Sequence, residues 1–579
     1  MINNFTDKAN FIWQVADDIL RGAFKAHEYG DVILPFVVLR RLDLVLEEHK
    51  DDVIEQFEQF KNVLNDEQIV PVLRKAAGDK NFYNHSFYDL HRLAQDAQNI
   101  ELNFNNYLSG YSANVREIIE NFQLDKIITK LVKNDLLYML VEMFTEVDLS
   151  PGAVTNHEMG YIFEELLRRF SEMSNETAGE HYTPREVIRL MVSLMFAEHQ
   201  DELQGQGIIR TVFDPACGTG GMLITAKEYI QSEINPDVEV VMYGQELNEQ
   251  TYAIAKSDVL IMGENAENVR QGSSFSEDRF KGQRFSYMLS NPPFGVSWKK
   301  EANFIKNEAN DPHGRFHAGT PRSSDGALLF LQHMISKMEA GGSRIAIIFN
   351  GSPLFTGDAG SGESNIRKWI IENDWLEAVI AMPTQMFYNT GIATYIWMVT
   401  NRKPAHRRGK VQLINAVDFA APMRKSLGNK RKYFQDEHIR DITQIYADFT
   451  EGDYCKIFDN ADFGYTKVTV ERPLRVQTSE VSETSEVLMD RKGNPKPDSK
   501  RRDTEKIPLK DDVDAYFERE VLPHVPDAWM DRKKDKVGYE ISFTKYFYEY
   551  QPLRSLDEIK ADILALEAET DGLLGEILG

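Results

Sequence analysis

The sequence predicts an α/β protein whose central domain is a doubly wound, mainly parallel sheet, preceded by an all-helical domain and followed by a helical tail. Apolar residues between Asn10 and about Gln59 recur at the spacing of amphipathic helices, and this pattern continues with interruptions to about residue 150. After Ser150-Pro151-Gly152, short β-branched runs alternate with helical stretches, which is typical of βαβ units. We therefore expect a helical domain over 1–150 and a sheet domain over 151–475.

Individual elements follow from the same patterns. The expected strands and helices of the central domain are strands at 238–243, 343–349 and 376–381, and helices at 252–262 and 326–338. Further along, the stretch 490–506 is polar and rich in Lys, Asp and Pro, which predicts an exposed hairpin or linker. The last segment is helical again. Residues 476–579 are therefore expected to form a linker or hairpin and a coiled-coil-like helical tail.

The composition is that of an ordinary globular protein. Its 579 residues are enough for two or three domains, and 42% hydrophobic with 27% charged residues argues against disorder. No run reaches the roughly 18 apolar residues of a membrane-spanning helix, and the N-terminus lacks a secretory pattern. Two cysteines, Cys217 and Cys455, are too few for a four-cysteine zinc site or a disulfide framework. We expect a protein of a reducing cytoplasm with no membrane contact.

The charge balance bears on nucleic-acid binding. The formal net charge of −25 argues against a protein that coats DNA by itself, because phosphate contacts need Lys and Arg. Basic residues are nevertheless concentrated at 402–410, at 424–425 and at 430–432. Each cluster is either a solvated turn or a local contact with nucleic acid, and a partner would have to supply the remaining positive charge.

A predicted strand at 208–213 runs into a turn that begins at Asp214 and contains Gly218–Gly221. A strand, a glycine turn and a following helix form a ligand-binding corner at the carboxyl end of a parallel sheet. The dinucleotide pattern G-x-G-x-x-G fails, because Leu223 stands where its third glycine is needed. The carboxylate of Asp214 would repel a pyrophosphate, so the corner favours a cationic or zwitterionic ligand.

An acidic residue, Glu246, follows the next predicted strand. A carboxylate at this place accepts hydrogen bonds from both hydroxyls of a ribose. Asp214 and Glu246 together indicate an adenosyl ligand with a positively charged end, which describes S-adenosylmethionine. The alternatives are another nucleotide or a purely structural turn.

A strand predicted at 285–289 leads to Asn291-Pro292-Pro293-Phe294. The two prolines make a stiff corner, in which the Asn291 amide oxygen and the Pro292 carbonyl can both accept hydrogen bonds from an amino group. Two acceptors on one NH₂ direct its lone pair toward a methyl donor, and Phe294 could stack on a base taken out of the duplex. The alternative is a proline turn with a core phenylalanine.

These two motifs resemble the motif pair of N6-adenine DNA methyltransferases. A third element, Ala178–Arg185, lies just after a helix predicted at 159–170 and is similar to the cofactor loop of type I restriction–modification modification subunits. The order of the three motifs, the helical N-terminal domain and the stretch Phe543–Tyr548 also match that family. The resemblance spans most of the chain, and it implies a Rossmann-like methyltransferase domain in the bacterial or archaeal cytoplasm.

The resemblance implies methyl transfer to adenine N6, with S-adenosylhomocysteine as product and no metal. The positions that match the family's cofactor contacts are Glu180, His181, Tyr182, Thr183, Pro184, Arg185, Asp214, Gly218, Thr219, Gly220, Gly221 and Glu246. Asn291–Phe294 would form the adenine pocket. The implied partners are double-stranded DNA with a flipped adenine, a DNA-specificity subunit, a second modification subunit and a restriction (translocase/nuclease) subunit.

Two positions depart from the family pattern. The loop 271–274 reads Gln-Gly-Ser-Ser where an acidic residue is frequent, and Ser286 stands where the strand before Asn291 commonly carries Asp. Cys217 lies inside the glycine turn and is expected to be a packing residue, because direct attack by an amine needs no covalent enzyme intermediate.

Other functions are also compatible with these patterns. A self-sufficient adenine methyltransferase, an enzyme acting on RNA or on a protein glutamine, and a non-catalytic scaffold of a nuclease assembly are the alternatives. In the tail, apolar residues alternate steps of three and four, as in a heptad seam: Leu556, Ile559, Ile563, Leu566, Thr570, Leu573 and Ile577. We expect this seam to dock on helices of a specificity subunit, whereas the alternative is packing on its own domain.

Overall fold

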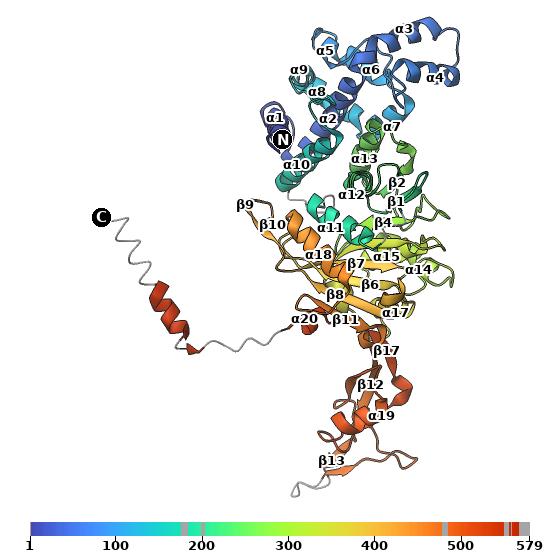
Figure 1. Ribbon diagram of the computed structural model, residues 1–579, viewed down its shortest axis with the longest axis vertical. Coiled ribbons are helices and arrows are strands. Elements are labelled where there is room, and N and C mark those ends of the chain that lie inside the picture. The colour runs from blue at the N-terminus through green and yellow to red at the C-terminus, as the bar shows by residue number, and fades with distance from the viewer. Residues whose placement is uncertain are drawn as a thin grey trace. The chain divides into compact units, whose positions relative to one another are not determined.

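The computed structural model describes residues 2–174, 183–198, 203–388, 390–477, 485–548, 555–556 and 558–566 (Figure 1). The chain divides into two compact units, Met1–Ile541 and Ser542–Gly579. None of the helices in these described ranges combines the length and the apolar character needed to span a membrane. The division into three domains expected from the sequence remains a prediction.

The N-terminal region is all-helical, as the apolar periodicity predicts. Its helices are α1 (Ile2–Leu20), α2 (Tyr29–Leu46), α3 (Lys50–Phe60), α4 (Asp66–Ala76), α5 (Leu90–Leu93), α6 (Ile100–Ser109), α7 (Ala113–Asn121), α8 (Leu124–Lys133) and α9 (Leu137–Thr145). Helix α2 is the central one, since almost all its side chains are buried. Buried Arg41 on α2 donates hydrogen bonds to the carbonyls of Leu149 and Val154, and so holds the chain that leaves the region.

The helical region packs against two helices of the region that follows, α10 (Asn156–Ser174) and α13 (Glu249–Ile261). On α13, the Tyr252 hydroxyl and the Lys256 ammonium both lie 2.8 Å from carboxylate oxygens of Glu117 on α7. Gln250 donates to Asp31 on α2 over 2.7 Å. The helix that begins three residues after Glu246 is therefore fixed by the N-terminal region.

Within the described residues, the central sheet has nine strands in the order β11-β8-β6-β7-β5-β4-β1-β2-β3. Their bounds are β1 (Ile209–Asp214), β2 (Glu239–Glu246), β3 (Val269–Gln271), β4 (Tyr287–Ser290), β5 (Arg344–Asn350), β6 (Leu376–Ala381), β7 (Thr394–Thr400), β8 (Lys410–Asn415) and β11 (Cys455–Asp459). Only β7 and β11 run antiparallel to their neighbours. The sheet is mainly parallel, as predicted, and the predicted strands agree with β1, β2, β5 and β6 to within a few residues.

Helices cover both faces of this sheet, which makes it doubly wound. Val212, Leu289 and Ile348 share one core with α11 (Arg185–Phe196), α12 (Gly221–Tyr229), α13 and α18 (Asp436–Asp448). The side chain of Phe213 points to the other face, where its ring contacts His333 on α15 (Ala327–Ser336). The remaining helices of this region are α14 (Ala302–Ala309), α16 (Ser352–Phe355) and α17 (Gly362–Glu372).

A second, antiparallel sheet follows the central one and was not predicted from the sequence. It pairs β12 (Gly464–Glu471) with β15 (Asp503–Pro508), β16 (Trp529–Met530) and β17 (Lys536–Tyr539), beside α19 (Val513–Tyr516). A short hairpin pairs β13 (Arg475–Gln477) with β14 (Ser485–Val487). Only Ile507 of β15 is buried, so its sequence carries almost no strand periodicity. Buried Arg367 on α17 donates to the carbonyl of Tyr539 over 2.6 Å and ties this sheet to the central one.

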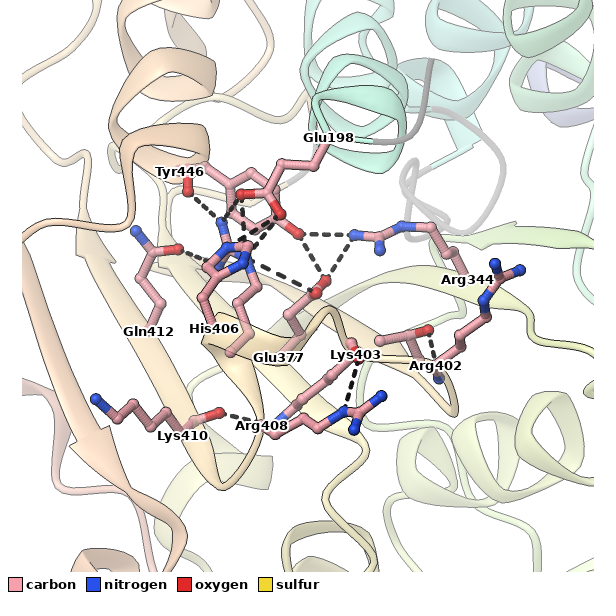
Figure 2. A network of polar contacts seen from close by, with 12 residues as sticks. Glu198, Arg344, Glu377, Arg402, Lys403, His406, Arg408, Lys410, Gln412 and Tyr446 are labelled. Atoms are coloured by element: carbon pink, nitrogen blue, oxygen red, sulfur yellow. Dashed lines mark hydrogen bonds and ion pairs between the residues drawn. The ribbon is translucent and has the colours of Figure 1, made fainter. Parts of the chain in front are cut away.

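Part of the basic cluster at 402–410 has a structural role, since two of its five Lys and Arg residues, Lys403 and Arg407, are buried (Figure 2). Arg407 is fully buried and bonds Glu198 over 2.6 Å, and Lys403 bonds Asp374 over 2.6 Å. Next to them, Arg344 donates to Glu377 over 2.6 Å at the amino ends of β5 and β6. Lys403, Arg407 and Arg344 are thus neutralised inside the protein and are not available to nucleic acid.

The second unit contains α20 (Phe543–Tyr546) and a helical stretch over 558–566. The apolar side chains of this stretch are exposed, with Ile563 at 54% and Leu566 at 62%. Thr570, Leu573 and Ile577 of the predicted seam lie outside the described residues.

Candidate functional site

Three acidic or amide side chains predicted to act together meet at one edge of the central sheet. Strands β4, β1 and β2 are adjacent and parallel, so their carboxyl ends lie side by side. Asp214 ends β1, Glu246 ends β2 and Asn291 directly follows β4. The topology therefore brings the predicted cofactor corner and the predicted target motif to one place.

The glycine turn between β1 and α12 needs its glycines for backbone reasons. Gly218 and Gly220 have φ values of +55° and +83°, a region that other L-residues rarely adopt. The turn closes through a 2.8 Å bond from the Gly220 N–H to the Cys217 carbonyl. Cys217 itself is buried against Gly244, and burial raises the pKa of its thiol, as suits a packing residue. The turn leaves the N-terminus of α12, which begins at Gly221, facing the pocket.

Asp214 is 1% exposed, and one of its carboxylate oxygens accepts bonds from the Ala216 N–H at 2.9 Å and from the Ser290 hydroxyl at 2.8 Å. Burial raises the pKa of Asp214 to about 7, and the nearby charge of Glu246 adds to this effect. A cation bound at this corner would lower that pKa again, so the site is electrostatically suited to a positively charged ligand.

Glu246 is held by the backbone on both of its carboxylate oxygens. One oxygen accepts from the Gly218 N–H over 3.0 Å and the other from the Asn248 N–H over 2.8 Å. These bonds fix the carboxylate immediately behind the glycine turn, at the N-terminus of α13. Each oxygen retains further acceptor capacity for hydroxyl donors.

Asn291 is oriented by Thr183, which precedes α11. The Asn291 amide nitrogen donates to the Thr183 hydroxyl over 2.9 Å. The amide oxygen is buried and has no hydrogen-bond partner among the described residues. An unpaired buried acceptor is costly, so this oxygen is a ready binding point for a donor group of a ligand. Pro292 is buried, and Phe294 is partly buried against the main core.

A residue that the sequence reasoning missed, Glu164 on α10, faces the same pocket. It is 5% exposed and pairs with buried Arg185 over 3.2 Å, and its second carboxylate oxygen has no partner among the described residues. Burial raises the pKa of Glu164 even though Arg185 opposes that shift. No motif marks Glu164, because it is one of many acidic residues on amphipathic helices.

The pocket at this edge spans about 380 Å³, part of which is open to solvent. It is lined by Glu164, Thr183, Ile188, Asp214, Ala216, Cys217, Gly218, Thr219, Gly221, Met222 and Asn291. Six predicted site residues thus share one pocket, whereas the other described ones do not line it, namely Pro184, Arg185, Gly220, Glu246, Pro292, Pro293 and Phe294. Glu180, His181 and Tyr182 lie outside the described residues. Within the described ranges, no group of three or more His, Cys, Asp or Glu side chains is arranged to hold a metal ion.

The two departures from the family pattern also have places in the structure. The Ser274 hydroxyl donates to the Pro215 carbonyl over 2.5 Å and so supports the start of the glycine turn. Ser286 precedes β4 at the opposite edge of the sheet and donates to Glu339 over 3.1 Å. The residue of this segment that reaches Asp214 is Ser290.

Comparisons with known proteins agree with this geometry. Residues 154–484 match the N-6 DNA Methylase family, and residues 8–144 match the HsdM N-terminal domain. The chain is 28% identical to the Type I restriction enzyme MjaIX methylase subunit of Methanocaldococcus jannaschii, over 79% of this chain and 80% of that protein. It is 24% identical to the EcoKI methylase subunit of Escherichia coli, over 56% of this chain and 60% of that protein.

A solved structure, the type I restriction–modification methyltransferase subunit of Streptococcus thermophilus, has the same fold. Its TM-score is 0.61 at 22% identity, with 80% of this chain and 97% of that chain covered. The family match spans more than half of the sequence and is preceded by the matching N-terminal domain. The chain therefore belongs to the N-6 DNA methylase family, as a modification subunit of the type I restriction–modification kind.

Proposed function

We propose that this chain transfers a methyl group from S-adenosylmethionine to the N6 amino group of adenine in double-stranded DNA, as the modification subunit of a type I assembly. The observation that carries the proposal is the buried, unpartnered amide oxygen of Asn291 in the pocket that also contains Asp214 and the glycine turn. An amino group is the donor that such an acceptor needs.

The residues around the pocket fit S-adenosylmethionine. Its sulfonium supplies an electrophilic methyl group, and its positive charges suit a site lined by Asp214 and Glu164. The glycine turn lets the ligand approach the backbone closely, and Glu246 is placed to accept from the ribose hydroxyls. The unpartnered oxygen of Glu164 supports a contact with the ammonium of the methionine end.

Asn291 acts on the target amine. Its amide oxygen and the Pro292 carbonyl accept the two N–H groups of the adenine amine, which concentrates electron density on nitrogen and directs its lone pair to the methyl group. Thr183 keeps the amide from rotating, because it holds the amide nitrogen. As the N–CH₃ bond forms, the S–CH₃ bond breaks and the amine releases one proton. Phe294 is placed to stack on the flipped base.

Partners are part of this proposal. A chain with a net charge of −25 needs basic surface from elsewhere to stay on DNA, which supports an assembly with a DNA-specificity subunit, a second modification subunit and a restriction subunit. The exposed apolar residues of 555–566 support a helical docking segment in the tail.

The direct test is methyl transfer by the chain coexpressed with a DNA-specificity subunit from its own host. With labelled S-adenosylmethionine and unmethylated duplex DNA, N6-methyladenine should be the only methylated base. The chain alone should transfer little. Equal activity of the isolated chain would favour the self-sufficient enzyme, and transfer to RNA instead of DNA would refute the proposed substrate.

A further inference from the structure

The basic residues at 424–425 and 430–432 lie on a hairpin, labelled β9 and β10 in Figure 1. It consists of β9 (Ala421–Leu427) and β10 (Lys430–Tyr433), which pair antiparallel to each other and, in the described ranges, to no other strand. Residues 421–433 contain five basic side chains and no acidic one, in a chain with 91 acidic and 66 basic residues. This composition is opposite to that of the chain as a whole.

The hairpin is attached firmly through its second strand. Lys430 is 3% exposed, and its ammonium bonds the carboxylate of Glu186 and the carbonyl of Met386. The backbone N–H groups of Asn429 and Arg431 donate to the carbonyls of Tyr388 and Gln385 over 2.7 and 2.9 Å. The basic side chains are therefore carried on an anchored element.

The anchors are parts of the candidate site's own edge of the sheet. Glu186 lies in the first turn of α11, three residues after Thr183, the residue that holds Asn291. Gln385 and Met386 belong to the loop that follows β6. Because β4, β5 and β6 all point the same way, this loop leaves the sheet at the edge where Asn291 stands.

The hairpin's remaining cations are not neutralised. Arg424, Lys425 and Arg431 are exposed, and Lys432 is partly exposed. In the described part of the chain, no carboxylate lies within ion-pair distance of these four side chains. Lys403 and Arg407 of the 402–410 cluster, in contrast, are buried and bonded to Asp374 and Glu198. The exposed cations of that cluster, Arg402, Arg408 and Lys410, lie between the end of β7 and the start of β8, at the opposite edge of the sheet. Of the two clusters, the hairpin thus presents exposed cations at the edge where Asn291 stands.

We infer that the β9–β10 hairpin binds the phosphate backbone of the duplex beside the target adenine. This role rests on the proposed function, and it gives the modification subunit a DNA-contact surface of its own. Cations at the edge where the base must enter would offset the repulsion from the acidic chain. Contacts of this kind position the duplex without reading its sequence.

The test is the salt dependence of DNA binding by the full modification assembly, measured with cognate and non-cognate duplexes. R424Q/K425Q removes two hairpin cations. K281Q/R284Q is the matched control, because Lys281 and Arg284 are exposed and unpaired in the described structure but precede β4 at the opposite edge. The slope of log K against log[salt] should become shallower by about 0.9 per lost phosphate contact, about 1.8 for R424Q/K425Q.

We expect R424Q/K425Q to weaken binding to both duplexes alike, with unchanged S-adenosylhomocysteine affinity and an intact assembly, while K281Q/R284Q matches the wild type. An unchanged slope and affinity in R424Q/K425Q would overturn the inference. So would loss of subunit association, which would assign the hairpin to a protein partner. A wild-type assembly that binds DNA but methylates no adenine would instead refute the proposed function. The effect of R424Q/K425Q on DNA binding would still test the hairpin in that case.

Discussion

The Asn291 amide nitrogen donates to the Thr183 hydroxyl over 2.9 Å, and this single bond determines which way the amide faces. Its oxygen is thereby left buried and unpartnered among the described residues, beside the pocket that contains Asp214. The segment that carries Thr183 and the Asn291–Phe294 motif are far apart in sequence, yet this contact couples them. The orientation of the Asn291 amide should therefore depend on the position of Thr183.

Glu246 tests the assignment of the adenosyl end. Glu246→Ala should weaken S-adenosylmethionine binding by about 1.5–3 kcal/mol, the range for hydrogen bonds to a charged group. Calorimetry on the purified chain measures this, and circular dichroism checks that the variant is folded. An unchanged affinity in a folded variant would remove Glu246 from the cofactor site.

Glu164 tests the methionine end. Glu164→Gln should lower the affinity for S-adenosylhomocysteine about tenfold, because a charged acceptor for the ammonium is lost. It should leave the affinity for methylthioadenosine, which lacks the amino-acid part, unchanged. Glu165→Gln is the matched control, since Glu165 lies on the same helix but pairs with Arg168 and Arg169. Equal losses for both ligands would mean that Glu164 only supports the structure.

Asp214 predicts a pH dependence of cofactor binding. Because burial raises its pKa to about 7, Asp214 becomes protonated as the pH falls from 8 to 6, and the attraction for a cationic ligand is lost. The affinity for S-adenosylmethionine should drop about tenfold over this interval beyond any change seen in Asp214→Asn. If the affinity for S-adenosylmethionine changed with pH in the same way in the wild type and in Asp214→Asn, protonation of Asp214 would have no effect on ligand binding.

Much of the site was predictable because its residues follow strands in sequence. Asp214 and Glu246 stand at the ends of strands with β-branched residues, and Asn291 follows a short apolar strand. Parallel pairing of these strands brings their ends together. The glycine turn was equally predictable from the sequence, since only glycine readily adopts the positive φ values found there.

The rest depends on tertiary contacts that leave no local pattern. Glu164 reaches the pocket because α10 packs on α1, α2 and α13 and because Glu164 pairs with Arg185, and nothing in its own helix distinguishes it from Glu165. The antiparallel sheet around β12 was missed because its partner strand β15 is charged and mostly exposed and β16 has only two residues. The basic clusters could be located in the sequence, but only burial separates Arg407 from Arg424.

The tail is the predicted link to the assembly. Deleting Ser555–Gly579 should leave S-adenosylmethionine binding intact but abolish stable association with the specificity subunit. The deletion removes the exposed apolar side chains, such as Ile563, that are expected to dock on that subunit. Size-exclusion chromatography of the coexpressed subunits measures the association. If the truncated chain still elutes in the complex and methylates DNA, the seam has no part in assembly.

Asn291 carries the central claim, so the decisive measurement is single-turnover methyl transfer by the full assembly containing Asn291→Ala. The transfer rate should fall about 100-fold or more, because the amide acts on the amine in the transition state, while S-adenosylhomocysteine affinity should stay near the wild-type value. A variant that still methylates adenine at close to the wild-type rate would contradict the proposed role of the buried amide oxygen.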